Sequence, residues 1–138
     1  MTLHFSVEPV VMRIVRKKAA AATRAVGASE DVAREVELAV GEALANTYVH
    51  AYDNAAGPVE MEVEAEPGHV AFTVRDQGES RRMVHLPETL SDDPWNGDGV
   101  RHYGLYVIKQ LVDEVTIVHP PPEGRGTSLH FVKRFSVG

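Results

Sequence analysis

Cysteine is absent from this chain of 138 residues, and several other features are equally scarce. Without cysteine, a disulfide framework, a thiolate nucleophile and a cysteine-type zinc site are all excluded. No apolar run approaches the roughly 20 residues that a membrane helix needs, because basic side chains interrupt the longest such stretch, residues 10–25. The Walker A sequence GxxxxGKS/T is also missing, which excludes a P-loop nucleotide site.

Positive charge is scarce as well. The chain has 14 basic and 20 acidic residues and a net charge of −6, which argues against charge-driven binding to nucleic acid. The seven histidines show no zinc-ligand spacing. A hydrophobic fraction of 43% and this length fit one domain over residues 1–138. No signal peptide is visible at the start, so we expect a cytoplasmic protein.

The spacing of apolar residues predicts the order of the elements. Residues 3–7 alternate as in a strand, residues 11–26 have helical spacing with Val11, Ile14, Val15 and Ala19 on one face, and Ser29 opens a second helix that continues to about residue 52. Two strands follow at 59–66 and 69–75, then a helix at 103–111 and strands at 115–118 and 127–135. Segregated helices and antiparallel strands favour a two-layer α+β sandwich.

The second helix carries three polar side chains on one face. Glu42, Asn46 and His50 are spaced four residues apart, so they project from a face different from the apolar stripe. An amide oxygen suits Mg²⁺, which takes few protein ligands beside phosphate oxygens. A carboxylate one turn earlier can accept a proton from an attacking hydroxyl. The alternative is a solvated polar face without a function.

Asp76, Gln77 and Gly78 follow the predicted strand at 69–75. A carboxylate at this point can accept a hydrogen bond from an exocyclic amine, as adenine recognition requires. Glycine allows the backbone to approach a flat ring closely. The alternative is a simple Asp-Gly turn.

Residues 77–101 lack regular patterning, and an irregular stretch of that length is often a binding loop or lid. It ends in a glycine-containing segment, 99–105, ahead of the third predicted helix. Backbone N–H groups there can bind phosphate, and Arg101 can neutralise charge on a transferred phosphoryl group. A flexible loop is the alternative. Gly126 and Thr127, at the start of the last strand, indicate little by themselves.

Together, these four elements resemble the N, G1, G2 and G3 boxes of the histidine-kinase-like ATPase superfamily, which has the Bergerat fold. The chain is most similar to the stand-alone branch of serine kinases and anti-sigma factors. The similarity rests on residues 9–16, 36–46, 50–52, 104–109 and 111–115. It implies a mostly antiparallel mixed sheet covered on one face by helices, with an ATP lid at about 77–101.

The resemblance also implies roles for individual residues. Asn46 would hold Mg²⁺, Glu42 would be the general base, Asp76 would read adenine and Arg101 would contact the γ-phosphate. The remaining nucleotide-binding residues implied by the boxes are His50, Gly78, Gly104, Leu105, Gly126 and Thr127.

The implied partners are a sigma factor and a STAS-type anti-anti-sigma protein. The kinase would hold the sigma factor until the unphosphorylated antagonist displaces it, and it would phosphorylate that antagonist on serine. A homodimer is also implied, whereas direct binding to nucleic acid or to a membrane is not expected.

Three residues depart from the pattern of the family. Ser80 and His102 stand where the boxes usually have glycine, and the bulky Tyr103 follows His102. Each replaced glycine adds a Cβ where backbone approaches the nucleotide. They favour an alternative function, a non-catalytic or weakly nucleotide-binding interaction switch on the same fold. A simple ATPase without a protein acceptor is a third possibility.

Overall fold

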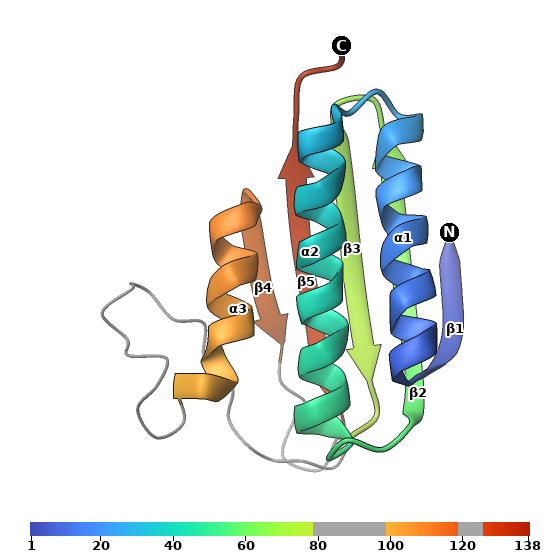
Figure 1. Cartoon of the computed structure of the whole chain (residues 1–138), viewed down its shortest axis with the longest axis vertical. Coiled ribbons are helices and arrows are strands. Elements are labelled where there is room, and N and C mark those ends of the chain that lie inside the picture. Colours follow the sequence, from blue (N-terminus) through green and yellow to red (C-terminus); the bar gives the residue numbers. More distant parts are fainter. Residues whose placement is uncertain (79–98, 119–125) are drawn as a thin grey trace.

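The computed structural model describes residues 1–78, 99–118 and 126–138, and only the backbone of residues 99–103. Three long helices lie side by side on one face of a sheet (Figure 1). Along the chain the elements are β1 (Thr2–Val7), α1 (Pro9–Ala25), α2 (Glu30–Asn46), the π-helix η1 (Thr47–Ala51), β2 (Gly57–Glu66), β3 (His69–Asp76), α3 (Gly99–Leu111), β4 (Glu114–Val118) and β5 (Ser128–Arg134). The predicted α+β sandwich and its element order are confirmed.

The sheet has the strand order β1-β2-β3-β5-β4, and each of these pairings of described strands is antiparallel. The expected mixed character is therefore wrong for this part of the chain. The crossover through α3 makes β4 run parallel to β3, but β5 lies between them and is antiparallel to both. Phe72 of β3 and Phe131 of β5 are register partners, and their rings stack with centroids 5.2 Å apart.

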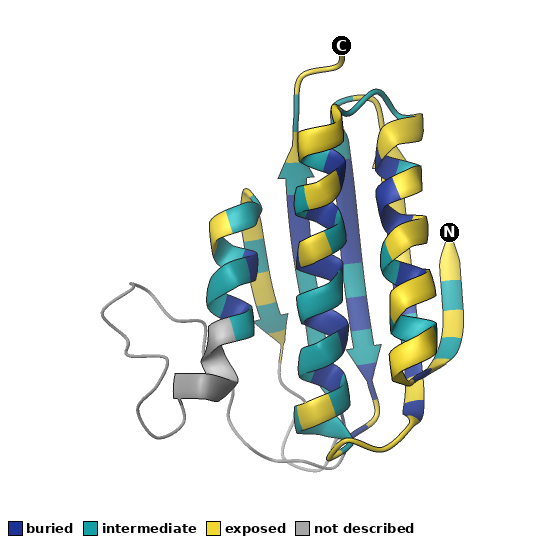
Figure 2. Cartoon of the chain, viewed as in Figure 1, coloured by how far each residue is buried: buried dark blue, intermediate teal, exposed yellow. Residues whose placement is uncertain are grey.

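The core lies between the helices and the sheet (Figure 2). On β2, Val59, Met61 and Val63 are buried, whereas the glutamates that alternate with them face away. Val36, Val40 and Leu44 form the buried stripe of α2. Burial of apolar side chains of this size stabilises a fold by about 1.5–3 kcal/mol each, so this stripe determines which face of α2 remains for polar chemistry.

The predicted apolar face of the first helix is confirmed at Val15 and Ala19, which are buried, and at Val11, which packs against the core, but not at Ile14. Ile14 is 48% exposed, and the buried positions of α1 include Ala19, Ala20 and Thr23. Thr23 can be buried because its hydroxyl donates to the Ala19 carbonyl at 2.8 Å. Small side chains fill these buried positions, and the larger Ile14 is left at the surface.

The helix boundaries also differ from the prediction. Ser29 caps α2 as predicted, because its side chain accepts a hydrogen bond from the Val32 N–H at 3.2 Å. The predicted continuation of this helix to about residue 52 is the π-helix η1 instead. Helix α3 begins at Gly99 rather than at residue 103, because no proline or glycine interrupts residues 100–103. Most of the predicted lid, residues 79–98, lies outside the described residues. No helix in the described part of the chain is long and apolar enough to cross a membrane.

Candidate functional site

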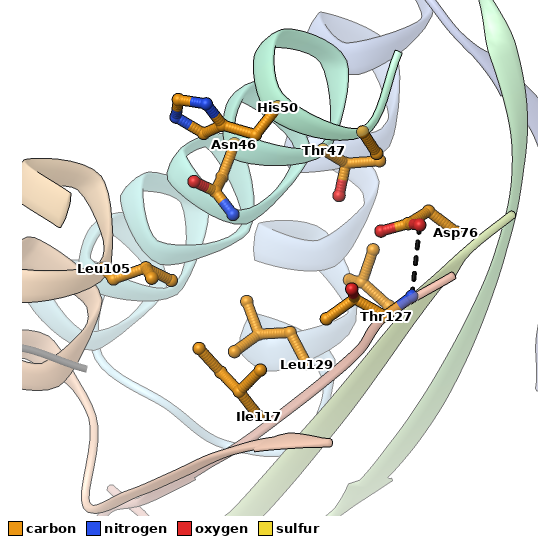
Figure 3. A pocket seen from close by; sticks show the side chains of 10 residues that line it. Asn46, Thr47, His50, Asp76, Leu105, Ile117, Thr127 and Leu129 are labelled. Carbon is orange, nitrogen blue, oxygen red and sulfur yellow. Dashed lines mark hydrogen bonds between the residues drawn. The ribbon is translucent and has the colours of Figure 1, made fainter. Parts of the chain in front are cut away.

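A pocket lies where the C-terminal end of α2 meets β3, β5 and α3 (Figure 3). It encloses about 510 Å³ of space between the atoms, part of which is open solvent. Its lining residues are Asn46, Thr47, His50, Ala51, Val74, Asp76, Leu105, Ile117, Thr127 and Leu129. Five of the residues predicted from the sequence are among them: Asn46, His50, Asp76, Leu105 and Thr127.

The polar side of the pocket comes from the junction between α2 and η1. Asn46 is the last residue of α2, and His50 lies in the π turn that follows. Both are half-buried, and both side chains lie on the α2 side of the pocket in Figure 3. A π turn inserts an extra residue and often occurs at functional sites. The predicted pairing of an amide and an imidazole on one surface is therefore present, although the helix changes type between them.

Asp76 ends β3 on the opposite wall and is only 8% exposed. Its Oδ1 accepts hydrogen bonds from the N–H groups of Gly78 at 3.0 Å and Thr127 at 3.1 Å. Burial raises the pKa of Asp76 above its ordinary value of 3.8, although these two bonds act in the opposite direction. A carboxylate fixed in this way is a rigid acceptor for a ligand's N–H group.

Gly78 and Gly126 lie next to Asp76, although neither is among the residues that line the pocket. The Gly126 N–H donates to the Gly78 carbonyl at 3.1 Å. A Cβ at Gly78 would stand 2.5 Å from the Ala51 carbonyl oxygen, and one at Gly126 would overlap the Asp76 carbonyl oxygen. Gly126 also has φ +85°, a conformation that other residues rarely adopt. Both glycines are thus required for the close backbone contact around Asp76.

Tyr52 supports the same turn and was not predicted from the sequence. Its hydroxyl donates to the Pro58 carbonyl at 2.6 Å and accepts from the Gln77 N–H at 2.7 Å. Burial raises the pKa of Tyr52 above 10.0, opposed by the Gln77 hydrogen bond. A Cβ at Gly57 would lie 2.5 Å from the Tyr52 ring. Tyr52 therefore joins the end of η1 to the turn after β3.

Glu42 and Gly104 lie against each other, next to the pocket but not among its lining residues. A Cβ at Gly104 would be 2.9 Å from Glu42 Oε2, so glycine on α3 leaves room for the carboxylate of α2. Because α3 begins at Gly99, Gly104 lies inside the helix and not in a loop before it.

Other pocket residues were not predicted: Thr47, Ala51, Val74, Ile117 and Leu129. Arg101, Ser80, His102, Tyr103 and the other side chains of 79–103 lie outside the described residues. Within the described part of the chain, no group of three histidine, aspartate or glutamate side chains could hold a metal ion.

Comparison with known proteins points to one family. Residues 5–133 match the family described as Histidine kinase-like ATPase domain. The chain is 29% identical over 105 residues to an anti-sigma F factor of Pasteuria penetrans, covering 72% of this chain and 67% of that protein. It is 33% identical over 97 residues to the serine-protein kinase RsbW of Staphylococcus epidermidis, covering 66% and 61%. It is 24% identical over 115 residues to RsbW of Oceanobacillus iheyensis, covering 80% and 73%.

A structural comparison gives the same fold. The mycobacterial sensor histidine kinase MprB superposes with a TM-score of 0.52 at 16% identity, over 99% of this chain and 100% of that one. At this identity the likeness concerns the fold alone. Because the family match extends over nearly the whole chain, the protein belongs to the histidine kinase-like ATPase domain family.

Proposed function

We propose that this protein is an ATP-dependent serine protein kinase that also acts as an anti-sigma factor. The observation that carries the proposal is the pocket in which Asp76 of β3 lies across from Asn46 and His50 of the α2–η1 junction. Relatives named anti-sigma F factor and serine-protein kinase RsbW support the choice of reaction. The chain spans 61% to 73% of the length of the three relatives compared.

In this proposal the adenine base binds at the inner end of the pocket. The second oxygen of Asp76 accepts from the exocyclic amine, because Oδ1 already accepts two backbone N–H groups. Leu105, Ile117 and Leu129 give the base apolar surroundings. Gly78 and Gly126 allow the close backbone contacts that hold Asp76 in position.

The triphosphate extends toward Asn46 and the N-terminus of α3 at Gly99, where a helix favours anions. The donor set fits Mg²⁺, since the half-buried Asn46 supplies one amide oxygen and this ion commonly binds one or two protein oxygens beside phosphate. Bound magnesium would supply charge neutralisation at the phosphoryl group. Arg101, in the first turns of α3, would also neutralise negative charge on the phosphoryl group.

Glu42 is the proposed general base. Its carboxylate lies between α2 and α3 beside Gly104. There a partner's serine can reach the γ-phosphate without entering the part of the pocket that binds adenine. The serine hydroxyl gives its proton to Glu42, its oxygen bonds to the γ-phosphorus, and the bond to the leaving ADP oxygen breaks. The serine belongs to a STAS-type antagonist, and we further propose a homodimer that holds a sigma factor in the cytoplasm.

The test uses two variants on the same helix face. Glu42→Ala should retain ATP binding but lose about 10²–10⁴-fold in transfer to a purified STAS-type protein. Asn46→Ala should lose the magnesium-dependent part of ATP affinity. Calorimetry measures binding and radiolabel transfer measures the reaction, with Glu37→Ala on α2 as the control that should change neither. Normal transfer by Glu42→Ala would reject its role as general base.

A second candidate function is a non-catalytic interaction switch. It is favoured by Ser80 and His102, which stand where the G1 and G2 boxes usually have glycine, and by the bulky Tyr103 after His102. The same assays separate the two functions: a switch gives no labelled partner with any STAS-type acceptor, whereas the kinase gives stoichiometric phosphoserine. Phosphate release without an acceptor protein would indicate a simple ATPase.

A further inference from the structure

Thr47 is a polar residue at the inner wall of the pocket that the proposed function does not use. It is the first residue of η1, lines the pocket and is only 6% exposed. Figure 3 shows its side chain and that of Asp76 pointing toward each other from opposite walls. A hydroxyl in this position meets any group that the Asp76 carboxylate binds.

The hydrogen bond of Thr47 determines what its oxygen can offer to a ligand. The hydroxyl donates its proton to the Ala43 carbonyl at 3.2 Å. The lone pairs of Thr47 Oγ1 are left to accept. At Asp76, both hydrogen bonds from described residues go to Oδ1, so Oδ2 is also left to accept. The two walls of the pocket thus present two acceptors to the same space.

We propose that Thr47 is a specificity-determining residue that, together with Asp76, selects purine nucleotides with an amino group at C6. This inference rests on the proposed function, in which the base lies in this pocket. An exocyclic amine has two N–H donors, one for each acceptor, whereas a 6-oxo purine would place a carbonyl oxygen against two acceptors and leave them unpaired. Asp76 alone would accept from one N–H; Thr47 accepts from the second.

Thr47→Val is a clean test of this role. Valine keeps the shape and branching of threonine, so the pocket wall is preserved. The Ala43 carbonyl also accepts the backbone N–H of residue 47, so removing the hydroxyl leaves no buried carbonyl without a partner. Thr47→Ser retains the acceptor and serves as the matched control.

The experiment measures dissociation constants of ATP, inosine triphosphate and purine riboside triphosphate, which has only hydrogen at C6, for the wild type and both variants. Thr47→Val should raise the dissociation constant of ATP about three- to tenfold. It should also reduce the ratio of affinities for ATP and inosine triphosphate. The variant should leave the dissociation constant of purine riboside triphosphate unchanged, because that base has no amino group at C6 that could donate a hydrogen bond to Thr47. Thr47→Ser should behave as the wild type with all three.

Two results would overturn the inference in different ways. Equal changes for ATP and purine riboside triphosphate, or no change for either, would reject the role of Thr47 while ATP binding itself remains. No binding of any of the three nucleotides to the wild type would reject the proposed function and the inference with it. Circular dichroism of each variant confirms that a loss of binding is not a loss of fold.

Discussion

At the scale of single residues, Asp76 is a buried carboxylate whose two hydrogen bonds do not fully offset the cost of burying its charge. Two backbone N–H groups stabilise the carboxylate, but desolvation is the larger effect and raises its pKa above 3.8. A group in this state is costly to the fold and useful to a ligand, because a ligand's N–H supplies the missing hydrogen bond. Perturbed carboxylates of this kind are common at functional sites.

The raised pKa of Asp76 has a consequence for stability. The native carboxylate binds a proton more tightly than the unfolded one, so its contribution becomes more favourable as pH falls through the native pKa toward 3.8. As the pH falls from about 7 to about 4, the wild type should therefore gain unfolding free energy relative to Asp76→Asn. Urea denaturation at several pH values measures it, and a constant difference would contradict the shift.

Gly126 and Gly41 form a contrasting pair of glycines. Gly126→Ala should lower the free energy of unfolding by about 2 kcal/mol or more, since the new Cβ meets the Asp76 carbonyl at a positive φ. Gly41→Ala, in the interior of α2, should raise it by up to about 1 kcal/mol, because its Cβ would be 3.4 Å from the flexible Arg16 side chain. Urea unfolding of both variants tests the prediction, which similar losses in the two would refute.

At the scale of elements, the π-helix η1 joins the end of α2 to the turn after β3. Ala51 packs on Gly78, and Tyr52 bridges Pro58 and Gln77. These contacts link the segment that carries Asn46 and His50 to the segment that carries Asp76. The two walls of the pocket are thus held at a fixed separation by the residues just after His50.

The Tyr52 hydroxyl is the testable part of this link. Tyr52→Phe keeps the ring against Gly57 but removes two hydrogen bonds, and it should lower the unfolding free energy by about 1–2 kcal/mol. Hydrogen exchange of the Gln77 amide should accelerate as well. Tyr48→Phe, the same substitution at the tyrosine inside η1, is the control. Unchanged Gln77 exchange in Tyr52→Phe would show that the bridge is not formed in solution.

At the scale of the whole molecule, the helical layer must be attached to the sheet for the pocket to exist. Lys133 of β5 makes one such attachment: its Nζ donates to Glu35 of α2 at 2.7 Å and to the Leu111 carbonyl at the end of α3 at 2.8 Å. A cation near the C-terminus of a helix also interacts favourably with the helix dipole. The side chain is 15% exposed, so this pair is better shielded from solvent than a surface pair.

Removing this attachment should be measurable. Lys133→Met keeps the aliphatic part of the side chain and should lower the unfolding free energy by about 1–2 kcal/mol. Lys18→Met, on the exposed face of α1, should stay within about 0.5 kcal/mol. Thermal unfolding compares the two, and equal effects would show that Lys133 acts only as a surface charge.

The sequence by itself determined the order and type of the elements, because apolar periodicity is local to each segment. It also determined the candidates Asn46, His50, Asp76 and Thr127, which the structure brings to one pocket. Periodicity was less reliable where segments join: it missed the π turn at residues 47–51 and placed Ile14 in the core. Such details depend on the neighbouring helix and not on spacing alone.

Only the tertiary structure decided which distant residues meet. The insertion of β5 between β3 and β4 brings Thr127 to Asp76 across 51 positions and Lys133 to Glu35 across 98. The same packing places Glu42 against Gly104 and Thr47 opposite Asp76. Contacts of this range follow from the order and register of strands in a closed core, and a local pattern of residue types does not encode that order.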